Sequence, residues 1–250
     1  MSFVFSLFIV RQKYLSHHMY LHTNLKLRST NYAPVWGCLC ATSIAIGWTV
    51  IFIIQPEFLT DLDARQQLIN KHSALLILWY IIDWLVFGLS LAFFSFSITG
   101  LIRSQFSIKE LLINLTSILS ASYCISVGLA EILGLLSQMS ATPYGNSQLQ
   151  FQAFIMVLQK LRGSTEFSCD IWLLLLNTWL WSKKLVHKSV CLLGIIVGLL
   201  GFLILFYQFY ILVMCYVALH CFWFGSISML LLFKSDQIKE SLNTQAEPHR

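Results

Sequence analysis

The stretch ALLILWYIIDWLVFGLSLAFFSFSITGLI, residues 74–102, is longer than the ~20 apolar residues that a helix needs to cross the hydrocarbon core of a bilayer. Its one charged residue is Asp83. Comparable apolar runs cover residues 36–54, 111–137, 190–206 and 211–233, and a further run ends at Trp181-Ser182. The sequence therefore predicts an all-α fold, a polytopic membrane helix bundle with six transmembrane helices.

The composition excludes a water-soluble domain. Hydrophobic residues make up 57% of the chain and charged residues 11%, whereas soluble domains carry about 25% charged residues. The net charge of +5 comes without a dense run of Lys and Arg. A nucleic-acid partner is therefore not expected, and the lipid bilayer is the expected surrounding.

The distribution of Lys and Arg orients the bundle. Cytoplasmic loops of membrane proteins carry the excess of these residues. With six spans, twelve of them lie on the side of the two termini and four on the other, so we expect both termini to be cytoplasmic. The twelve are Arg11, Lys13, Lys26, Arg28, Arg103, Lys109, Lys183, Lys184, Lys188, Lys234, Lys239 and Arg250, and the four are Arg65, Lys71, Lys160 and Arg162.

This topology divides the chain into three parts: a cytoplasmic N-terminal segment (1–35), a six-helix transmembrane domain (36–233) and a cytoplasmic polar tail (234–250). The apolar run 1–10 is too short to span a membrane, and positive charges follow it instead of preceding it, unlike in a signal peptide. Residues 1–18 are therefore expected to be a dispensable surface segment or an over-long start before Met19.

The fourth span leaves two interpretations open. Counting ~20 residues back from Lys183 places its outer end near Gly163. Apolar residues also recur at helical spacing upstream of Gly163, at positions 151, 154, 155, 158 and 161. We favour one continuous helix that begins near Leu149, and a separate surface helix broken at Gly163 is the alternative.

Four carboxylates lie within or at the edge of the predicted spans, where an ionised side chain is costly without a partner or water. At 1.5 Å per residue all four fall in the outer half of the bilayer, at a depth similar to that of His220. Arg162 precedes one of them by four residues, a spacing that permits pairing along the helix. The four are Asp83, Glu131, Glu166 and Asp170. These acids, Arg162 and His220 are the candidate binding residues.

Two stripes of small residues follow helical spacing. One combines Ser117, Ala121, Cys124 and Gly128 with Glu131, and the other contains Cys191, Gly194, Gly198 and Gly201. Small residues allow membrane helices to approach closely. We therefore expect both stripes, and with the first of them Glu131, to face neighbouring helices.

No cofactor or metal site is expected. The seven cysteines include no C-x-x-C pair and are interpreted as small apolar residues. His220 is expected to be a core histidine that hydrogen-bonds with Tyr216. The sequence also lacks H-E-x-x-H and G-x-S-x-G motifs, which makes an intramembrane enzyme the weakest of three functional classes.

The segment from Arg162-Gly-Ser-Thr-Glu-Phe-Ser-Cys-Asp-Ile-Trp-Leu-Leu-Leu-Leu to Gly201 resembles a group of uncharacterised bacterial six-helix integral membrane proteins. In that group an acid precedes a W-L-L-L-L run, and a basic loop and a Gly-rich fifth span follow. The resemblance covers residues 111–201, with Ser164, Thr165 and Cys169 at positions where the group has more glycine. It implies a multi-pass protein of a bacterial cytoplasmic (inner) membrane and no particular reaction.

Two further classes of function remain. In one, the acids form a site for a proton, a cation or a small cationic or polar solute, as in a transporter. In the other, they only stabilise the bundle, and the protein acts as a scaffold or assembly factor. Bundle hydrogen bonds contribute only about 0.6 kcal/mol each on average, whereas acids that are buried protonated cost little. These magnitudes do not separate the two classes.

Overall fold

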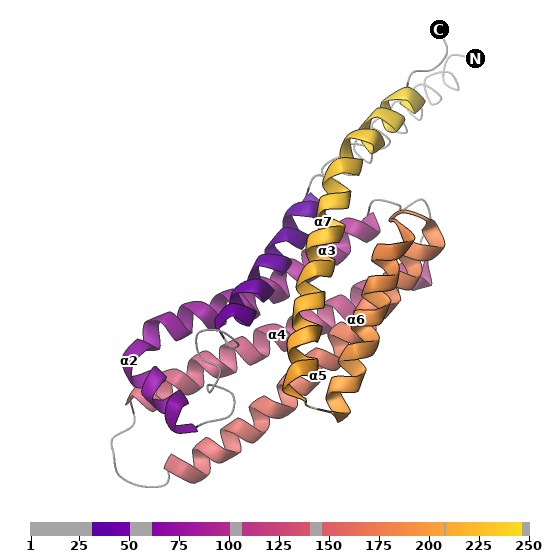
Figure 1. Cartoon of the computed structure of the whole chain (residues 1–250). Coiled ribbons are helices and arrows are strands. Elements are labelled where there is room, and N and C mark those ends of the chain that lie inside the picture. Colours follow the sequence, from indigo (N-terminus) through magenta and orange to yellow (C-terminus); the bar gives the residue numbers. More distant parts are fainter. Residues whose placement is uncertain (1–31, 51–61, 101–106, 141–146, 208, 247–250) are drawn as a thin grey trace, which may run out of the picture.

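The computed structural model describes residues 32–50, 62–100, 107–140, 147–207 and 209–246. Within these ranges every regular element is a helix, as predicted. The elements are a helix over residues 32–49, α2 (Leu62–Tyr80), the π-helix η3 (Ile81–Val86), α3 (Phe87–Gly100), α4 (Ile108–Ser140), α5 (Ser147–Lys183), α6 (Lys188–Phe206) and α7 (Tyr210–Ala246). Figure 1 shows them as one elongated bundle.

Four helical stretches are long and apolar enough to cross a membrane: 67–100, 108–136, 188–206 and 210–233. They correspond to the predicted second, third, fifth and sixth spans. Side chains such as Leu115, Leu133 and Leu199 are about half exposed on their outer faces, as expected where lipid surrounds the bundle. The chain is therefore a multi-pass membrane protein.

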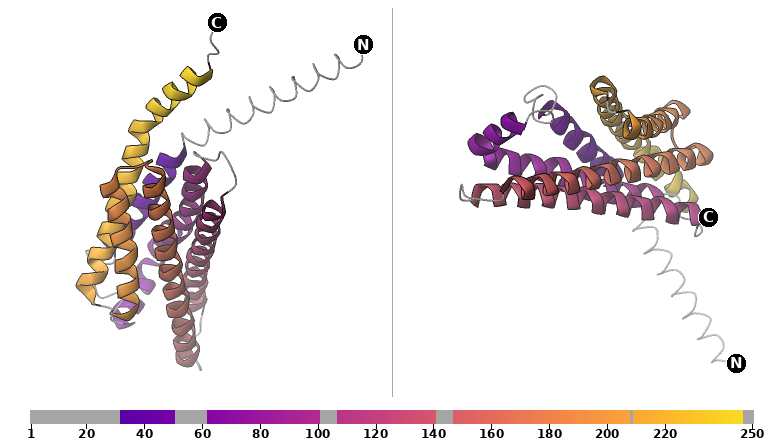
Figure 2. Two further views of the ribbon diagram at one scale, coloured as in Figure 1. Left: turned by 90° about the vertical axis from the view of Figure 1, so that its right-hand side faces the viewer. Right: turned by 90° about the horizontal axis from the view of Figure 1, so that it is seen from below.

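Neighbouring helices along the chain also pack side by side. α5 lies between α4 and α6, α3 packs on α4, and α6 on α7. The helix over 32–49 contacts both α3, where Trp36 stacks on Phe93 at 4.8 Å between ring centroids, and α7, where Cys221 Sγ approaches the Ala41 carbonyl at 3.3 Å. α5 and α7 project from opposite ends of the bundle (Figure 2).

The continuous fourth helix is confirmed, because α5 runs from Ser147 through Gly163 to Lys183 without a break. The second span differs from the expectation. The second apolar run was predicted to begin at residue 74, yet the helix that leads into it, α2, begins at Leu62 and has a non-helical backbone at His72. The predicted segment 1–18 lies outside the described residues.

Both predicted stripes of small residues are buried. A Cβ atom on Gly128 would meet Trp84 and Leu85 of η3, and one on Gly198 would lie 2.9 Å from the Leu174 side chain of α5. These glycines therefore set the close approach of α4 to η3 and of α6 to α5.

Candidate functional site

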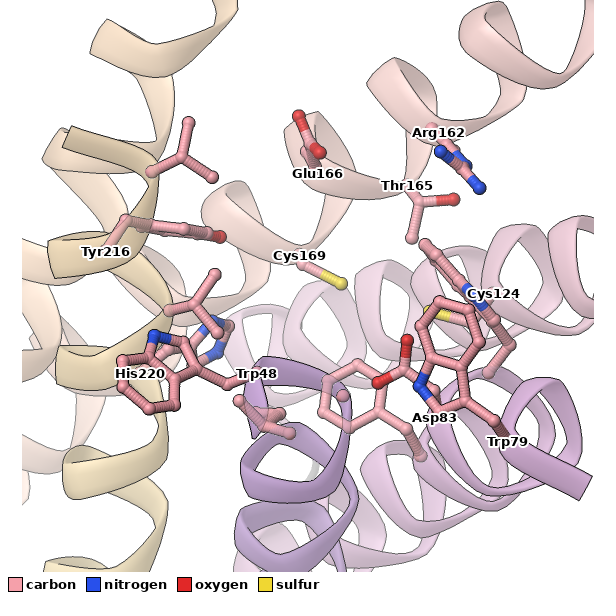
Figure 3. A pocket seen from close by; sticks show the side chains of 16 residues that line it. Trp48, Trp79, Asp83, Cys124, Arg162, Thr165, Glu166, Cys169, Tyr216 and His220 are labelled. Atoms are coloured by element: carbon pink, nitrogen blue, oxygen red, sulfur yellow. The ribbon is translucent and has the colours of Figure 1, made fainter. Parts of the chain in front are cut away.

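A cavity of about 230 Å³ lies among the helices (Figure 3). Its walls come from the helix over 32–49, α2, η3, α3, α4, α5 and α7. Four of the six candidate binding residues line it: Asp83, Arg162, Glu166 and His220. The other lining residues are Ile44, Gly47, Trp48, Trp79, Trp84, Phe87, Cys124, Thr165, Cys169, Val213, Tyr216 and Val217.

Asp83 lies on the π-helix η3, between two α-helical segments of the second span. π-helical turns are rare and occur frequently at functional sites. A Cβ atom on Gly47 would collide with the Asp83 carboxylate. The missing side chain at Gly47 therefore leaves the space that the carboxylate fills. Neither the π-helical turn nor the space at Gly47 was predicted from the sequence.

Arg162 forms an ion pair with Glu131, from Nη2 to Oε1. Glu131 is 1% exposed and Arg162 24%, so the pair is mostly removed from water. The Arg162 guanidinium also lies 5.9 Å from the ring centroid of Trp84, within cation–π range. The predicted pairing of Arg162 with Glu166 is replaced by this contact between α4 and α5. A fully buried carboxylate has the greater need of a partner, because water does not compensate it.

Glu166 lies on α5 one helical turn beyond Arg162, and its side chain is only partly buried. It lines the same cavity as Asp83. The cavity thus brings together two carboxylates and one guanidinium, and the guanidinium is already paired with a third carboxylate.

Asp170 is fully buried beside the cavity. The Tyr216 hydroxyl donates a hydrogen bond to its Oδ1 at 2.8 Å, and Tyr216 itself lines the cavity. In the part of the chain that the structure describes, Asp170 Oδ2 has no hydrogen-bond partner. A Cβ atom on Gly201 of α6 would collide with this carboxylate. The glycine stripe of α6 therefore makes room for Asp170 in addition to bringing the helices together.

The expected hydrogen bond between His220 and Tyr216 is wrong, because Tyr216 donates to Asp170 instead. His220 stacks on Phe224 with ring centroids 5.3 Å apart and meets Tyr216 edge-on at 5.4 Å. The imidazole is 6% exposed, and its Nε2 atom makes no hydrogen bond to any described residue. A buried polar atom at a cavity wall without a partner is available to a ligand.

An aromatic cluster lies one or two turns further along α3, α5 and α7 than the cavity residues Phe87, Cys169 and His220. It consists of Phe94, Trp172, Trp223 and Phe224, all 0% exposed, with ring centroids 4.9 to 6.4 Å apart. Phe224 of the cluster packs against two of the cavity residues, Phe87 and His220.

Both indole N–H groups of this cluster are satisfied. Trp172 Nε1 donates to Ser95 Oγ and Trp223 Nε1 donates to Asn177 Oδ1, each at 3.1 Å. Ser95 and Thr99 in turn donate to Asn114 Oδ1 at 3.2 and 3.1 Å. This network was not predicted from the sequence. A buried Trp needs an acceptor, and that requirement pointed to the polar residues of the neighbouring helices.

No protein family, curated protein or solved structure matches this chain. Among the described residues, no three His, Cys, Asp or Glu side chains gather as metal ligands. The cavity and its charges are therefore the basis for a functional proposal.

Proposed function

We propose that this protein crosses the membrane six times with both termini in the cytoplasm, and that it binds a small cation in the cavity, as a transporter does. One observation carries the proposal. Asp83 and Glu166 line the cavity, and the guanidinium beside them, Arg162, is already paired with Glu131. An ionised carboxylate in a membrane interior is costly without a counter-charge. A proton or a cation entering the cavity supplies that charge.

The six-span topology counts two further helices as membrane spans besides the four apolar stretches: α5 and the helix over 32–49. Two observations support these additions. α5 packs against α4 and α6, which are both long enough to span, and the helix over 32–49 lies against α3 and α7. The distribution of Lys and Arg supports the same topology and places both termini in the cytoplasm.

In this topology α3, α5 and α7 all run toward the cytoplasm. The cavity then belongs to the outer half of the bilayer, and the cluster of Phe94, Trp172, Trp223 and Phe224 lies between it and the cytoplasm. A transporter alternates between access from the two sides of the membrane. Release of a cation to the cytoplasm therefore requires the three helices to separate at this cluster.

A scaffold function is the second candidate, and a specific observation favours it. Glu131–Arg162, Asp170–Tyr216 and Asn177–Trp223 each join two helices through a buried polar contact. Such contacts hold a bundle together without any ligand. This interpretation gives no role to three groups of the cavity: Asp83, Glu166 and the His220 Nε2 atom.

Electrical recording from the full chain in liposomes on a solid support tests the proposal. Concentration jumps of H⁺, Na⁺, K⁺, ammonium and organic ammonium salts should give a transient current for at least one cation. The double variant Asp83→Asn/Glu166→Gln should lose the current and still accumulate in the membrane. The control variant Glu110→Gln removes a buried carboxylate outside the cavity. This variant should retain the current. If every cation is silent and the double variant is only less stable, the scaffold function is correct.

A further inference from the structure

We infer that the cavity takes a small organic ammonium ion with an apolar body, its charge at Asp83 and its body against tryptophan rings. The inference rests on the proposed cation site and narrows its ligand. It follows from the size of the cavity, the nature of its walls, the arrangement of its charges and one unpartnered nitrogen atom.

A bare ion would fill only a small part of the cavity. A cavity of about 150 Å³ in another protein holds a benzene molecule, whereas drug-sized ligands need at least about 300 Å³. The volume here is about 230 Å³. It suits a ligand of one ring with a short chain.

The walls are aromatic on several sides. Trp48, Trp79, Trp84, Phe87 and Tyr216 come from five different elements and all line the cavity. Aromatic faces attract cations, and they also accept apolar groups. The Arg162 guanidinium already lies over the Trp84 ring. The same side chains therefore suit both ends of a ligand that carries a charge and an apolar body.

The charges favour a monocation over a zwitterion. Asp83 contributes a carboxylate from η3 and Glu166 another from α5. Arg162, the one basic side chain among the lining residues besides His220, is neutralised by Glu131. A carboxylate on the ligand would compete with Glu131 for Arg162 and would be repelled by Asp83 and Glu166.

The His220 Nε2 atom is the independent sign of a ligand. His220 is more than nine-tenths buried, its side chain lines the cavity, and Nε2 has no hydrogen-bond partner among the described residues. As an acceptor, Nε2 takes a hydrogen bond from a hydroxyl group at one end of the ligand, and the Asp83 carboxylate takes an N–H of the ammonium group at the other end. Figure 3 shows His220 and Asp83 on opposite sides of the view, with Cys169 between them. The ligand must therefore be long enough to reach both walls.

The test is isothermal titration of the full chain in lipid nanodiscs with 2-(4-hydroxyphenyl)ethylammonium, whose ring hydroxyl is the donor for His220. Two reference compounds accompany it: 2-(4-hydroxyphenyl)ethanol, which has the same shape without the charge, and ammonium chloride, which has the charge without the body. We expect the amine to bind and each reference to bind at least tenfold more weakly. A charged hydrogen bond contributes about 1.5 to 3 kcal/mol, which is about 10-fold or more in affinity.

Matched variants locate the binding. Asp83→Asn should weaken binding of the amine about 10-fold or more, and Trp79→Leu and His220→Phe should weaken it several-fold. Glu110→Gln and Trp181→Leu should leave the affinity unchanged, because neither residue lines the cavity. Thermal melting of each variant in nanodiscs separates a loss of binding from a loss of folded protein.

Three results overturn the inference. Equal binding of 2-(4-hydroxyphenyl)ethanol would show that charge is irrelevant, and equal binding of tyrosine would assign Arg162 to a ligand carboxylate. If the amine does not bind but an inorganic cation gives a current that Asp83→Asn/Glu166→Gln abolishes, the inference fails and the proposed function stands. If no cation of either kind binds or moves charge, both fail.

Discussion

Arg162 on α5 is ion-paired with Glu131 on α4, although Glu166 lies one turn away on its own helix. The two paired residues are 31 positions apart in the sequence. Among the described residues, no other basic side chain forms an ion pair with Glu166 or Asp83, so the charge balance of the cavity depends on this pairing.

Removing the basic half of this pair should destabilise the bundle. Arg162→Met leaves Glu131 buried without its guanidinium, and we expect a loss of about 3 kcal/mol in the free energy of unfolding, the lower end for a buried pair because Arg162 is a quarter exposed. Unfolding in mixed micelles with increasing SDS measures it. The control Lys160→Met changes an exposed cation and should shift stability by about 0.5 kcal/mol or less.

The double variant Arg162→Met/Glu131→Leu completes this comparison. It removes both charges, so most of the lost stability should return. A double variant as unstable as Arg162→Met alone would show that the pair is not what stabilises this part of the bundle.

Gly201 should not tolerate a methyl group. Gly201→Ala places a Cβ atom on the Asp170 carboxylate, and we expect a loss of about 1 to 3 kcal/mol from overpacking. Gly225→Ala on α7 is the matched control, because a Cβ atom there meets nothing within 4 Å. It should be neutral or stabilising by up to about 1 kcal/mol, the gain in helix propensity. Equal effects of the two changes in the SDS titration would contradict the close packing of α6 on Asp170.

Ser95 should matter for the aromatic cluster. Ser95→Ala removes the acceptor of the Trp172 indole N–H and one donor to Asn114, and a buried donor without a partner costs about 1 to 3 kcal/mol. Ser122→Ala is the control, since Ser122 is exposed and bonds only the backbone carbonyl of Ile118. Thermal melting in detergent should show a clear loss for Ser95→Ala and a change of about 0.5 kcal/mol or less for Ser122→Ala. A Ser95→Ala protein as stable as the parent would contradict the network.

The proposed topology has its own test. Reporter fusions after Lys109 and after Lys184 should read as cytoplasmic, and a fusion near Asn146 should read as external, because α4 and α5 would cross the membrane in opposite directions. A cytoplasmic signal near Asn146 would overturn the six-span arrangement.

Much of the fold was predictable because it depends on local properties of the chain. The length of each apolar run predicted the helices, and the 3.6-residue period predicted which small residues of α4 and α6 face inward. The periodic spacing upstream of Gly163 also predicted the long α5. These features need only the chemistry of residues a few positions apart.

Part of the site was predictable for the same reason. The four acids, Arg162 and His220 stood out because charged or ionisable residues are costly in a membrane interior. Which of them would be partners was not predictable. Arg162 lies one turn from Glu166 and Tyr216 one turn from His220, so each had an obvious local partner. Instead, Arg162 pairs with Glu131 and Tyr216 donates to Asp170, both on other helices.

The sequence by itself determined that this protein is a multi-pass bundle of helices and which of its residues are ionisable within it. The tertiary structure decided that Asp83, Glu166 and His220 share one cavity, that Arg162 is neutralised by Glu131, and that Gly47 and Gly201 leave room for two carboxylates. The physical reason is that each helix's length and apolar character come from its own residues. Its rotation and depth against its neighbours come from close packing over the whole bundle, and those two quantities decide which side chains meet.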